Sequence, residues 1–306
     1  MNSKVIKGFG LSMLLSSMLL AESAAVVPII GNSGVATGIH PNEVTVQEDA
    51  AVSVNEKASA GDVAKKLANP VAAMISLPIQ ANYQPNMGTN DEGSQWLTNV
   101  QPVIPFDVSE DWNLISRTII PLVSKDTGVP GQDRINKVSD IVQSAWLSPK
   151  ELTSNGWIWG AGMAFLIPSG SNISAEKWGA GPTGLALKQD GPWTYGGLFN
   201  HIWDFAGSDI LDAKGNVANN VNQTFMQPFL TYITPQAVTF ALNTETTYDW
   251  EREQWTVPIN FVVTKVVTIG SQMISVGGGV TYWAEAPENG PEGLGVRLLL
   301  TFIFPK

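Results

Sequence analysis

The chain has 306 residues, of which 44% are hydrophobic and 14% are charged, and its formal net charge is −10. The acidic balance disfavours nucleic-acid binding, which needs lysine and arginine against the phosphates. The absence of cysteine excludes disulfides, thiol nucleophiles and cysteine-ligated metals. Beyond the extreme N-terminus no apolar run reaches the ~18 residues of a membrane helix. These features leave a soluble β-protein or a β-barrel.

The first 25 residues have the pattern of a secretory signal. Lys4 and Lys7 precede an apolar run at 8–20, and small residues follow at 21–25. We expect cleavage of this signal, residues 1–25, and export from the cytoplasm. An N-terminal anchor helix is the alternative.

The next segment, residues 26–70, has no sustained periodicity and is predicted to be a periplasmic lead. It contains one predicted short helix, 59–69, which Ser59 can cap and Pro70 stops. The helix could plug the barrel or be a solvated linker.

From residue 71 to residue 306 the hydrophobic pattern has period 2. The segment 236–250 carries apolar side chains mainly on one parity, and Asn243, Glu245 and Asp249 on the other. Alternate strand residues point to opposite faces of a sheet, so each such segment has one apolar and one polar face. About twelve strands are predicted, an even number as in bacterial barrels. They cover 72–83, 95–106, 112–123, 138–147, 156–167, 178–187, 193–205, 222–233, 237–248, 255–268, 272–284 and 293–304.

Connection lengths and tryptophan positions both favour a membrane barrel over a soluble sandwich. Long connections such as 124–137 and 206–221 alternate with tight ones such as 234–236, as expected for long external loops and short periplasmic turns. The tryptophans lie near predicted strand ends, where two aromatic girdles are expected. The external girdle is predicted to contain Trp96, Trp178, Trp203, Trp250, Trp255 and Trp283, and the periplasmic girdle Trp112, Trp146, Trp157, Trp159 and Trp193.

Prolines inside the predicted strands oppose this interpretation, because proline cannot donate to a β-ladder. A closed barrel has no edge on which to place them, so bulges or bends are expected there. The prolines concerned are Pro78, Pro102, Pro105, Pro121, Pro182, Pro228 and Pro258.

Several segments resemble a known family. They include QPVIPF at 101–106, DWNLISRTIIP at 111–121, GWIWGAGMAFLIPSG at 156–170 and two longer stretches, 179–207 and 282–306. Over roughly residues 69–306 the chain resembles the MetA-pathway of phenol degradation family, whose members are sometimes labelled neuromedin U. The resemblance implies an outer-membrane β-barrel transporter of small solutes, including aromatic or hydrophobic compounds. It implies no set of functional residues.

The candidate site consists of polar residues on the inward parity. An arginine at mid-depth facing lipid would cost roughly 2–4 kcal/mol, so Arg117 and Arg297 are predicted to face the lumen. Glu245, Asp249 and Glu285 are the predicted counter-charges. The predicted lumen amides are Asn99, Gln101, Gln227, Asn243 and Asn260. These residues could form a charged constriction that orients a solute, or a structural network that braces the wall.

The function predicted from the sequence is passive passage of small solutes through the outer membrane of a Gram-negative bacterium. We expect no enzymatic activity, cofactor or metal. The expected partners are outer-membrane lipid, the solute and the barrel-assembly machinery, which would bind the last strand, 293–304. Both a monomer and an oligomer such as a trimer remain open, as does a secreted soluble sandwich that binds a ligand. A further alternative is a lipid hydrolase on the barrel wall using His201 as base, although no G-x-S-x-G elbow is present.

Overall fold

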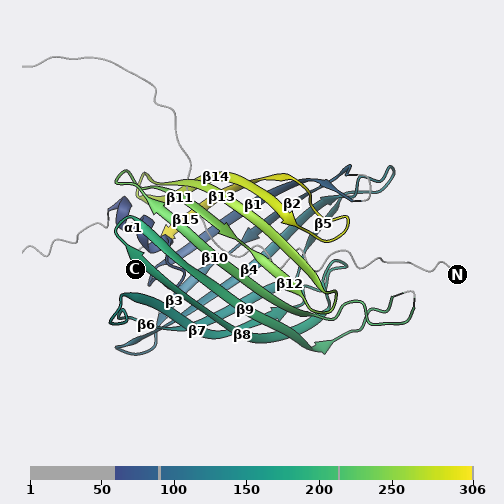
Figure 1. Cartoon of the computed structure of the whole chain (residues 1–306), viewed down its shortest axis with the longest axis horizontal. Coiled ribbons are helices and arrows are strands. Elements are labelled where there is room, and N and C mark those ends of the chain that lie inside the picture. The colour runs from purple at the N-terminus through teal and green to yellow at the C-terminus, as the bar shows by residue number, and fades with distance from the viewer. Residues whose placement is uncertain (1–58, 89–90, 213, 305–306) are drawn as a thin grey trace, which may run out of the picture.

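The computed structural model describes residues 59–88, 91–212 and 214–304, and these form one closed β-barrel preceded by a short helix (Figure 1). The chain runs from one end of the barrel to the other twelve times, and each of these passages is called a crossing. The predicted signal peptide, 1–25, and most of the predicted lead, 26–58, lie outside the described residues.

Three of the twelve crossings are each interrupted once, so that fifteen strands make up the wall. No helix in the described part of the chain is long and apolar enough to cross a membrane. The elements are α1 (Ala60–Leu67), β1 (Ile75–Met87), β2 (Gly93–Val100), β3 (Val103–Asp107), β4 (Trp112–Asp126), β5 (Ile135–Val138), β6 (Ile141–Pro149), β7 (Trp157–Ile167), β8 (Lys177–Asp190), β9 (Trp193–Gly207), β10 (Asn222–Ile233), β11 (Val238–Thr244), β12 (Thr246–Asp249), β13 (Gln254–Ile269), β14 (Gln272–Glu285) and β15 (Leu294–Phe304).

The sheet is an antiparallel meander that closes on itself. Each crossing pairs with the crossings before and after it, and β1 pairs with β15 to complete the cylinder, for example Ala81 with Leu298. Closure satisfies the backbone hydrogen bonds that an open sheet edge would leave unpaired. The predicted all-β, up-and-down barrel of about twelve strands is therefore confirmed.

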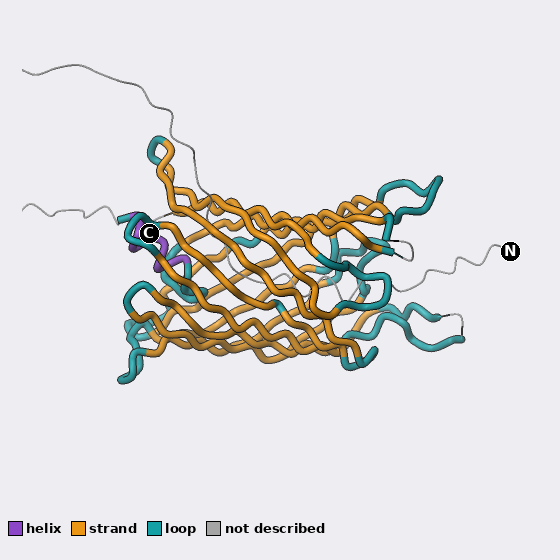
Figure 2. Tube along the Cα trace, turned by 45° about the horizontal axis from the view of Figure 1, so that its top comes forward, coloured by secondary structure: helices purple, strands orange, loops and turns teal. Residues whose placement is uncertain are grey.

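The two ends of the barrel differ in their connections (Figure 2). One end, which we call the short-turn end, carries tight turns such as 191–192 and 270–271, and α1 lies there. The other, the long-loop end, carries longer segments such as 168–176 and 208–221. The chain enters β1 and leaves β15 at the short-turn end. Outer-membrane barrels place short turns in the periplasm.

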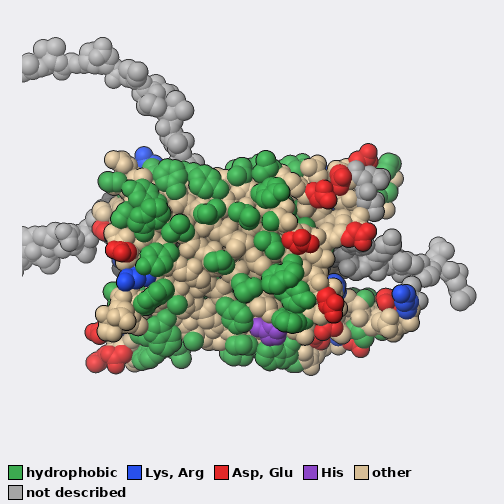
Figure 3. Space-filling view, in the orientation of Figure 1, with side chains coloured by type: hydrophobic (Ala, Val, Ile, Leu, Met, Phe, Trp, Pro, Cys, Tyr) green, Lys and Arg blue, Asp and Glu red, His purple; other side chains and the backbone are tan. Residues whose placement is uncertain are grey.

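The outer surface carries a belt of exposed apolar side chains (Figure 3). Phe240, Leu242 and Leu298 point outward and are 40%, 48% and 49% exposed. Acidic and basic side chains gather toward the two ends of the same face. An apolar belt bounded by polar ends is the surface of a protein that sits in a bilayer, and it excludes the soluble sandwich.

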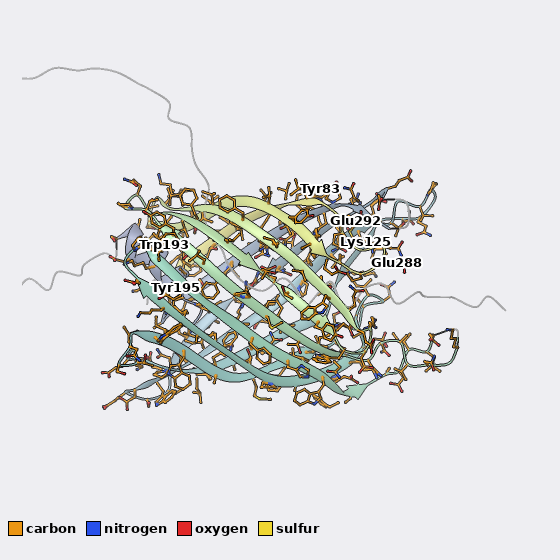
Figure 4. All side chains as sticks on the ribbon, in the orientation of Figure 1. Tyr83, Lys125, Trp193, Tyr195, Glu288 and Glu292 are labelled. Atoms are coloured by element: carbon orange, nitrogen blue, oxygen red, sulfur yellow. The ribbon has the colours of Figure 1, made fainter. Side chains whose placement is uncertain are left out.

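Aromatic side chains flank this belt at both ends. At the short-turn end Trp112 stacks edge-on against Trp159, and Trp193 against Tyr232. At the long-loop end Tyr248 contacts both Trp250 and Trp255. Figure 4 shows Trp193 and Tyr195 at one end and Tyr83 at the other. These are the two girdles expected of a membrane barrel.

Two tryptophans differ from the prediction. Trp146 is fully buried inside the barrel, where its Nε1 donates to Thr183 Oγ1 at 3.1 Å, so its assignment to a girdle is wrong. Trp283 lies near the long-loop end but is half-buried and shares the parity of the lumen residue Thr281. Both tryptophans lie near strand ends, as predicted. The strand parity, however, decides whether a side chain faces lipid or the lumen.

The in-strand prolines explain one break in the wall. The predicted strand 237–248 divides into β11 and β12 at Glu245. The register of the neighbouring strands places Pro228 opposite Thr244 and Pro258 opposite Glu245. Both neighbours therefore lack a backbone N–H donor at this point, and the ladder is interrupted.

Two other boundaries also differ from prediction. The predicted strand 95–106 divides into β2 and β3 around Gln101 and Pro102, and β5 adds residues before the predicted strand 138–147. Most of the remaining in-strand prolines are accommodated without a break, as Pro182 is in β8, where it lies opposite Met163.

Helix α1 lies in the lumen at the short-turn end. The Ser59 side chain caps it by accepting from Asp62 N at 3.1 Å. Its buried residues Val63 and Ala64 pack with inward-facing apolar side chains at the ends of several strands, namely Ile233, Val266, Met273 and Ile303. The helix is thus packed against the barrel wall and is not a solvated linker.

A charge placed in the apolar belt tests the inside–outside assignment. We expect Leu298→Arg to lower the free energy of unfolding by about 2–4 kcal/mol, because Leu298 lies near the middle of β15 on the outer face. Urea unfolding from lipid vesicles, with heat-modifiable gel mobility as a check of folding, measures this loss.

The control is Leu211→Arg in the exposed loop 208–221, for which we expect a change within about 0.5 kcal/mol. An unchanged stability for Leu298→Arg would show that this face does not contact lipid.

Candidate functional site

Nine of the ten residues predicted to line the pore are buried side chains on the inward parity of their crossings, with Gln101 and Glu245 at breaks between two strands. They are Arg117, Arg297, Glu245, Asp249, Asn99, Gln101, Gln227, Asn243 and Asn260. Glu285, the tenth, is exposed at the long-loop end of β14. Period 2 thus found the correct face, and the depth and partners of each residue follow from the tertiary structure.

An ion pair joins distant strands across the interior. Arg297 on β15 donates from Nη1 and Nη2 to Glu245 Oε1 and Oε2 at 2.9 and 2.8 Å. Its Nε donates to Asn82 Oδ1 at 2.7 Å. Each of the three guanidinium nitrogens of Arg297 therefore donates to a protein oxygen, and each Glu245 oxygen accepts one of these bonds. Such a bidentate pair is a strong charge-assisted interaction.

Arg117 on β4 is held less completely. Its Nη2 donates to Gln101 Oε1 at 2.5 Å, and its Nη1 has no hydrogen-bond partner although the side chain is only 1% exposed. Glu245 attracts Arg117 electrostatically, but this carboxylate is already bonded to Arg297. Arg117 therefore lies within electrostatic reach of the ion pair but is not bonded to it.

Neutral polar side chains continue from this charged group along the wall. Asn260 Nδ2 donates to Asn243 Oδ1 at 2.9 Å, and Thr281 Oγ1 donates to Asn260 Oδ1 at 2.7 Å. Asn99 and Gln227 are fully buried on the same inward face of their strands. The predicted amides are therefore parts of an inward-facing polar surface.

Two predicted counter-charges do not contact the arginines that they were expected to pair with. Asp249 Oδ2 accepts from Arg252 Nη1 at 2.8 Å and from Gln223 Nε2 at 3.0 Å, while its Oδ1 accepts from the backbone of residues 251 and 252. Asp249 organises the connection between β12 and β13 at the long-loop end. Glu285 lies at the same end, away from the charged group.

The lumen wall is divided into two parts. The inward faces of β1, β2 and β11–β15 are mostly polar, with residues such as Gln80, Asn82 and Thr301. Those of β6–β10 carry large apolar side chains such as Trp146, Leu187 and Phe225 beside the amides Asn200 and Gln227, and are uncharged except near the long-loop end. Such a lumen can contact the polar and apolar parts of one solute at the same time.

The sequence did not point to the loop contacts at the long-loop end. Asp140 Oδ2 accepts from Ala175 N at 2.7 Å, and its other oxygen accepts from Ser174 Oγ. Asn219 Nδ2 donates to Ala175 O at 2.6 Å. These bonds hold the segments 168–176 and 208–221 together at the lumen. A single aspartate inside the predicted strand 138–147 carries no periodic signal that would have identified it as a loop anchor.

His201 lies on the outward parity of β9, shared with the exposed Phe199 and Trp203, and its ring is 5.3 Å from that of Trp203. Its Nδ1 is 2.8 Å from Thr224 Oγ1, which also accepts from Trp250 Nε1 at 2.8 Å. Among the described residues no carboxylate is bonded to the ring, so it lacks the third group that orients a general base. In the same part of the chain no three His, Asp or Glu side chains converge on a metal position.

Comparisons with known proteins agree with this architecture. No family model matches the chain, and no curated protein matches it. An outer membrane channel from Pseudomonas putida F1 has a similar structure, with a TM-score of 0.57 and 14% identity over 76% of this chain and 96% of that one.

Two further structures are more distant. The NanC porin has a TM-score of 0.49 and 13% identity, covering 75% of this chain and 99% of its own. Outer membrane phospholipase A from Escherichia coli has a TM-score of 0.47 and 9% identity, covering 81% and 99%. The fold, the apolar belt and the girdles together define an outer-membrane β-barrel.

The ion pair between β15 and the β11–β12 break predicts a stability effect. We expect Arg297→Leu to lower the free energy of unfolding by about 3–5 kcal/mol, because Glu245 would remain buried without its partner. The double change Arg297→Leu with Glu245→Leu should recover most of the loss. Urea unfolding from vesicles, followed by tryptophan fluorescence, measures both.

The control is the exposed pair of Arg134 and Asp126, where we expect Arg134→Ala to change stability by less than about 1 kcal/mol. If Arg297→Leu were as harmless as Arg134→Ala, the ion pair would not be a structural element of the lumen.

Proposed function

We propose that this protein is a passive channel that carries small solutes across the outer membrane, and that Arg117, Arg297 and Glu245 form its selective constriction. One observation carries the proposal: Arg297 and Glu245 form an ion pair across the interior of the barrel, and Arg117, from a third part of the wall, lies within electrostatic reach of Glu245. Rings of charge inside a pore act on the ions and polar solutes that pass. A network that only braced the wall would not need an excess positive charge.

The family resemblance adds a finer proposal about the solute. It suggests aromatic or hydrophobic compounds, and the apolar wall with Trp146 and Phe225 is compatible with such a cargo. We also propose that the barrel-assembly machinery binds the last strand, β15, during insertion. Both a single barrel and an oligomer are compatible with this function.

The hydrolase alternative has less support. The pair formed by His201 and Thr224 faces outward, and the Thr224 oxygen already accepts a bond from Trp250. Loss of an esterase activity on His201→Ala, in a protein that still folds, would favour that alternative. Absence of activity in both proteins would reject it.

Conductance in planar bilayers tests the channel directly. We expect the purified protein to give ion currents, and Arg117→Glu to shift the permeability ratio of potassium to chloride several-fold toward potassium, since it replaces the constriction's excess positive charge by a negative one. The reversal potential in a potassium chloride gradient measures the ratio.

Lys214→Glu is the matched control, because it makes the same charge change in the exposed loop 208–221 and should leave the ratio unchanged. Silent bilayers, together with no solute flux into proteoliposomes, would refute the channel.

Helix α1 belongs to the same proposal as a partial plug of the short-turn end. We expect Ala64→Asp to raise conductance, because a carboxylate at this fully buried position would loosen the helix from the apolar side chains around it. Single-channel amplitude and open probability measure the effect.

Lys66→Asp provides the comparison, since Lys66 is on the exposed face of the same helix and should give wild-type currents. Equal currents for all three proteins would show that α1 does not restrict the pore.

A further inference from the structure

We propose that Arg117 binds the carboxylate of an amphipathic solute, so that the channel selects small organic monocarboxylates with an apolar body. This inference rests on the proposed channel function and names the class of solute. It starts from an imbalance in the interior: two arginines lie near one glutamate, and both oxygens of that glutamate accept from Arg297.

The imbalance leaves one positive charge without a bonded anion. Asp249, the next acidic side chain on the inward face of the same crossing, is bonded to Arg252 and Gln223. A buried charge without a partner is unfavourable, because desolvation is not repaid by an ion pair. An anion that enters the lumen would supply the missing partner.

The donor geometry of Arg117 is also incomplete. Arg297 donates from Nε, Nη1 and Nη2 to protein acceptors, whereas Arg117 donates from Nη2 to Gln101 and leaves Nη1 without a hydrogen-bond partner. Guanidinium groups match the planar carboxylate particularly well. The unbonded Nη1 of Arg117 is therefore suited to a carboxylate oxygen of the solute.

The surroundings of Arg117 specify the rest of the solute. Its neighbours on the inward face of β4 are Ile115 and Ile119, and Ile115 lies opposite Trp146 on β6. On the other side of Arg117 the polar wall begins with Gln101. A solute whose carboxylate binds Arg117 would thus place its apolar part against Ile115 and Trp146. Burial of apolar surface favours this position.

The acidic long-loop end does not oppose this selection. Glu288 and Glu292 lie there, as does Lys125 on β4 (Figure 4). Arg117 is eight residues before Lys125 on the same strand, near the middle of the wall. At roughly 3.3 Å per residue this separation exceeds 20 Å. The Debye length at physiological salt is about 8 Å, so exposed loop charges have little effect at that distance.

The test measures block of potassium chloride current in planar bilayers by added hexanoate. Acetate has the same head without the apolar body, and 1-hexanol has the body without the charge. We expect hexanoate to block at a concentration about ten- to hundredfold lower than either of these probes. Arg117→Ala should remove this preference, and Arg117→Lys should recover part of it, because the charge returns without the planar fork.

Lys125→Gln is the matched control, since Lys125 is a cation of the same inward parity near the long-loop end and should leave hexanoate block unchanged. Heat-modifiable mobility verifies that each variant folds. Equal block by hexanoate in the wild type and in Arg117→Ala, with chloride current intact, overturns the site and leaves the channel standing. If the wild type carries no current at all, the channel and its solute site both fail.

Discussion

The need to satisfy every backbone hydrogen bond inside a bilayer determines the rest of this structure. Lipid offers no donors or acceptors, so a strand can cross only if both of its edges are paired. The bonds between β1 and β15 meet this requirement, and the sheet becomes a cylinder with an inside and an outside. Because strand side chains alternate, half of each crossing must suit lipid and the other half is free to be polar.

The interior charges depend on this separation. Arg297 and Glu245 could not face the acyl chains without a large penalty, but inside the barrel they bond to each other, and Arg297 also donates to Asn82. Glu245 lies at the break between β11 and β12, and this break is itself a consequence of backbone chemistry. Because Pro228 and Pro258 remove the N–H donors on both sides, the ladder opens at this residue. The prolines that at first argue against a barrel thus explain the break in the sheet at which Glu245 lies.

The sequence could predict which face a residue takes, but not which residue it meets. The alternation of strand side chains, together with the cost of an arginine that faces lipid, predicts that Arg117 and Arg297 point inward. The same alternation predicts that Phe240 and Leu242, which are exposed, point outward. The bond from Arg297 to Glu245 joins strands that are three apart in the sheet, and no local pattern carries that information. For the same reason Asp249 was expected to pair across the lumen, whereas Arg252, three residues along the chain, is its partner.

Tryptophan shows where two valid rules conflict. The affinity of indole for the membrane interface predicts Trp146 in a girdle, but its strand parity, shared with Ser144 and Ser148, turns it into the lumen. Parity prevails because reversing one side chain would require a bulge that shifts all residues beyond it. The indole N–H then needs a partner inside the barrel, which Thr183 provides.

The placement of the charges relative to the two lumen walls has a further consequence. Arg117 is on β4, where the polar wall ends on one side, and Glu245 is between β11 and β12, where it ends on the other. Arg297 on β15 lies in the middle of the polar wall, three crossings from each. The charges therefore mark both seams and the centre of one half of the lumen, while the opposite half carries no charged side chain at this depth. In the proposed channel, a solute at this level would meet a field directed across the pore, and we expect this field to orient a molecule that has one charged end and one apolar end.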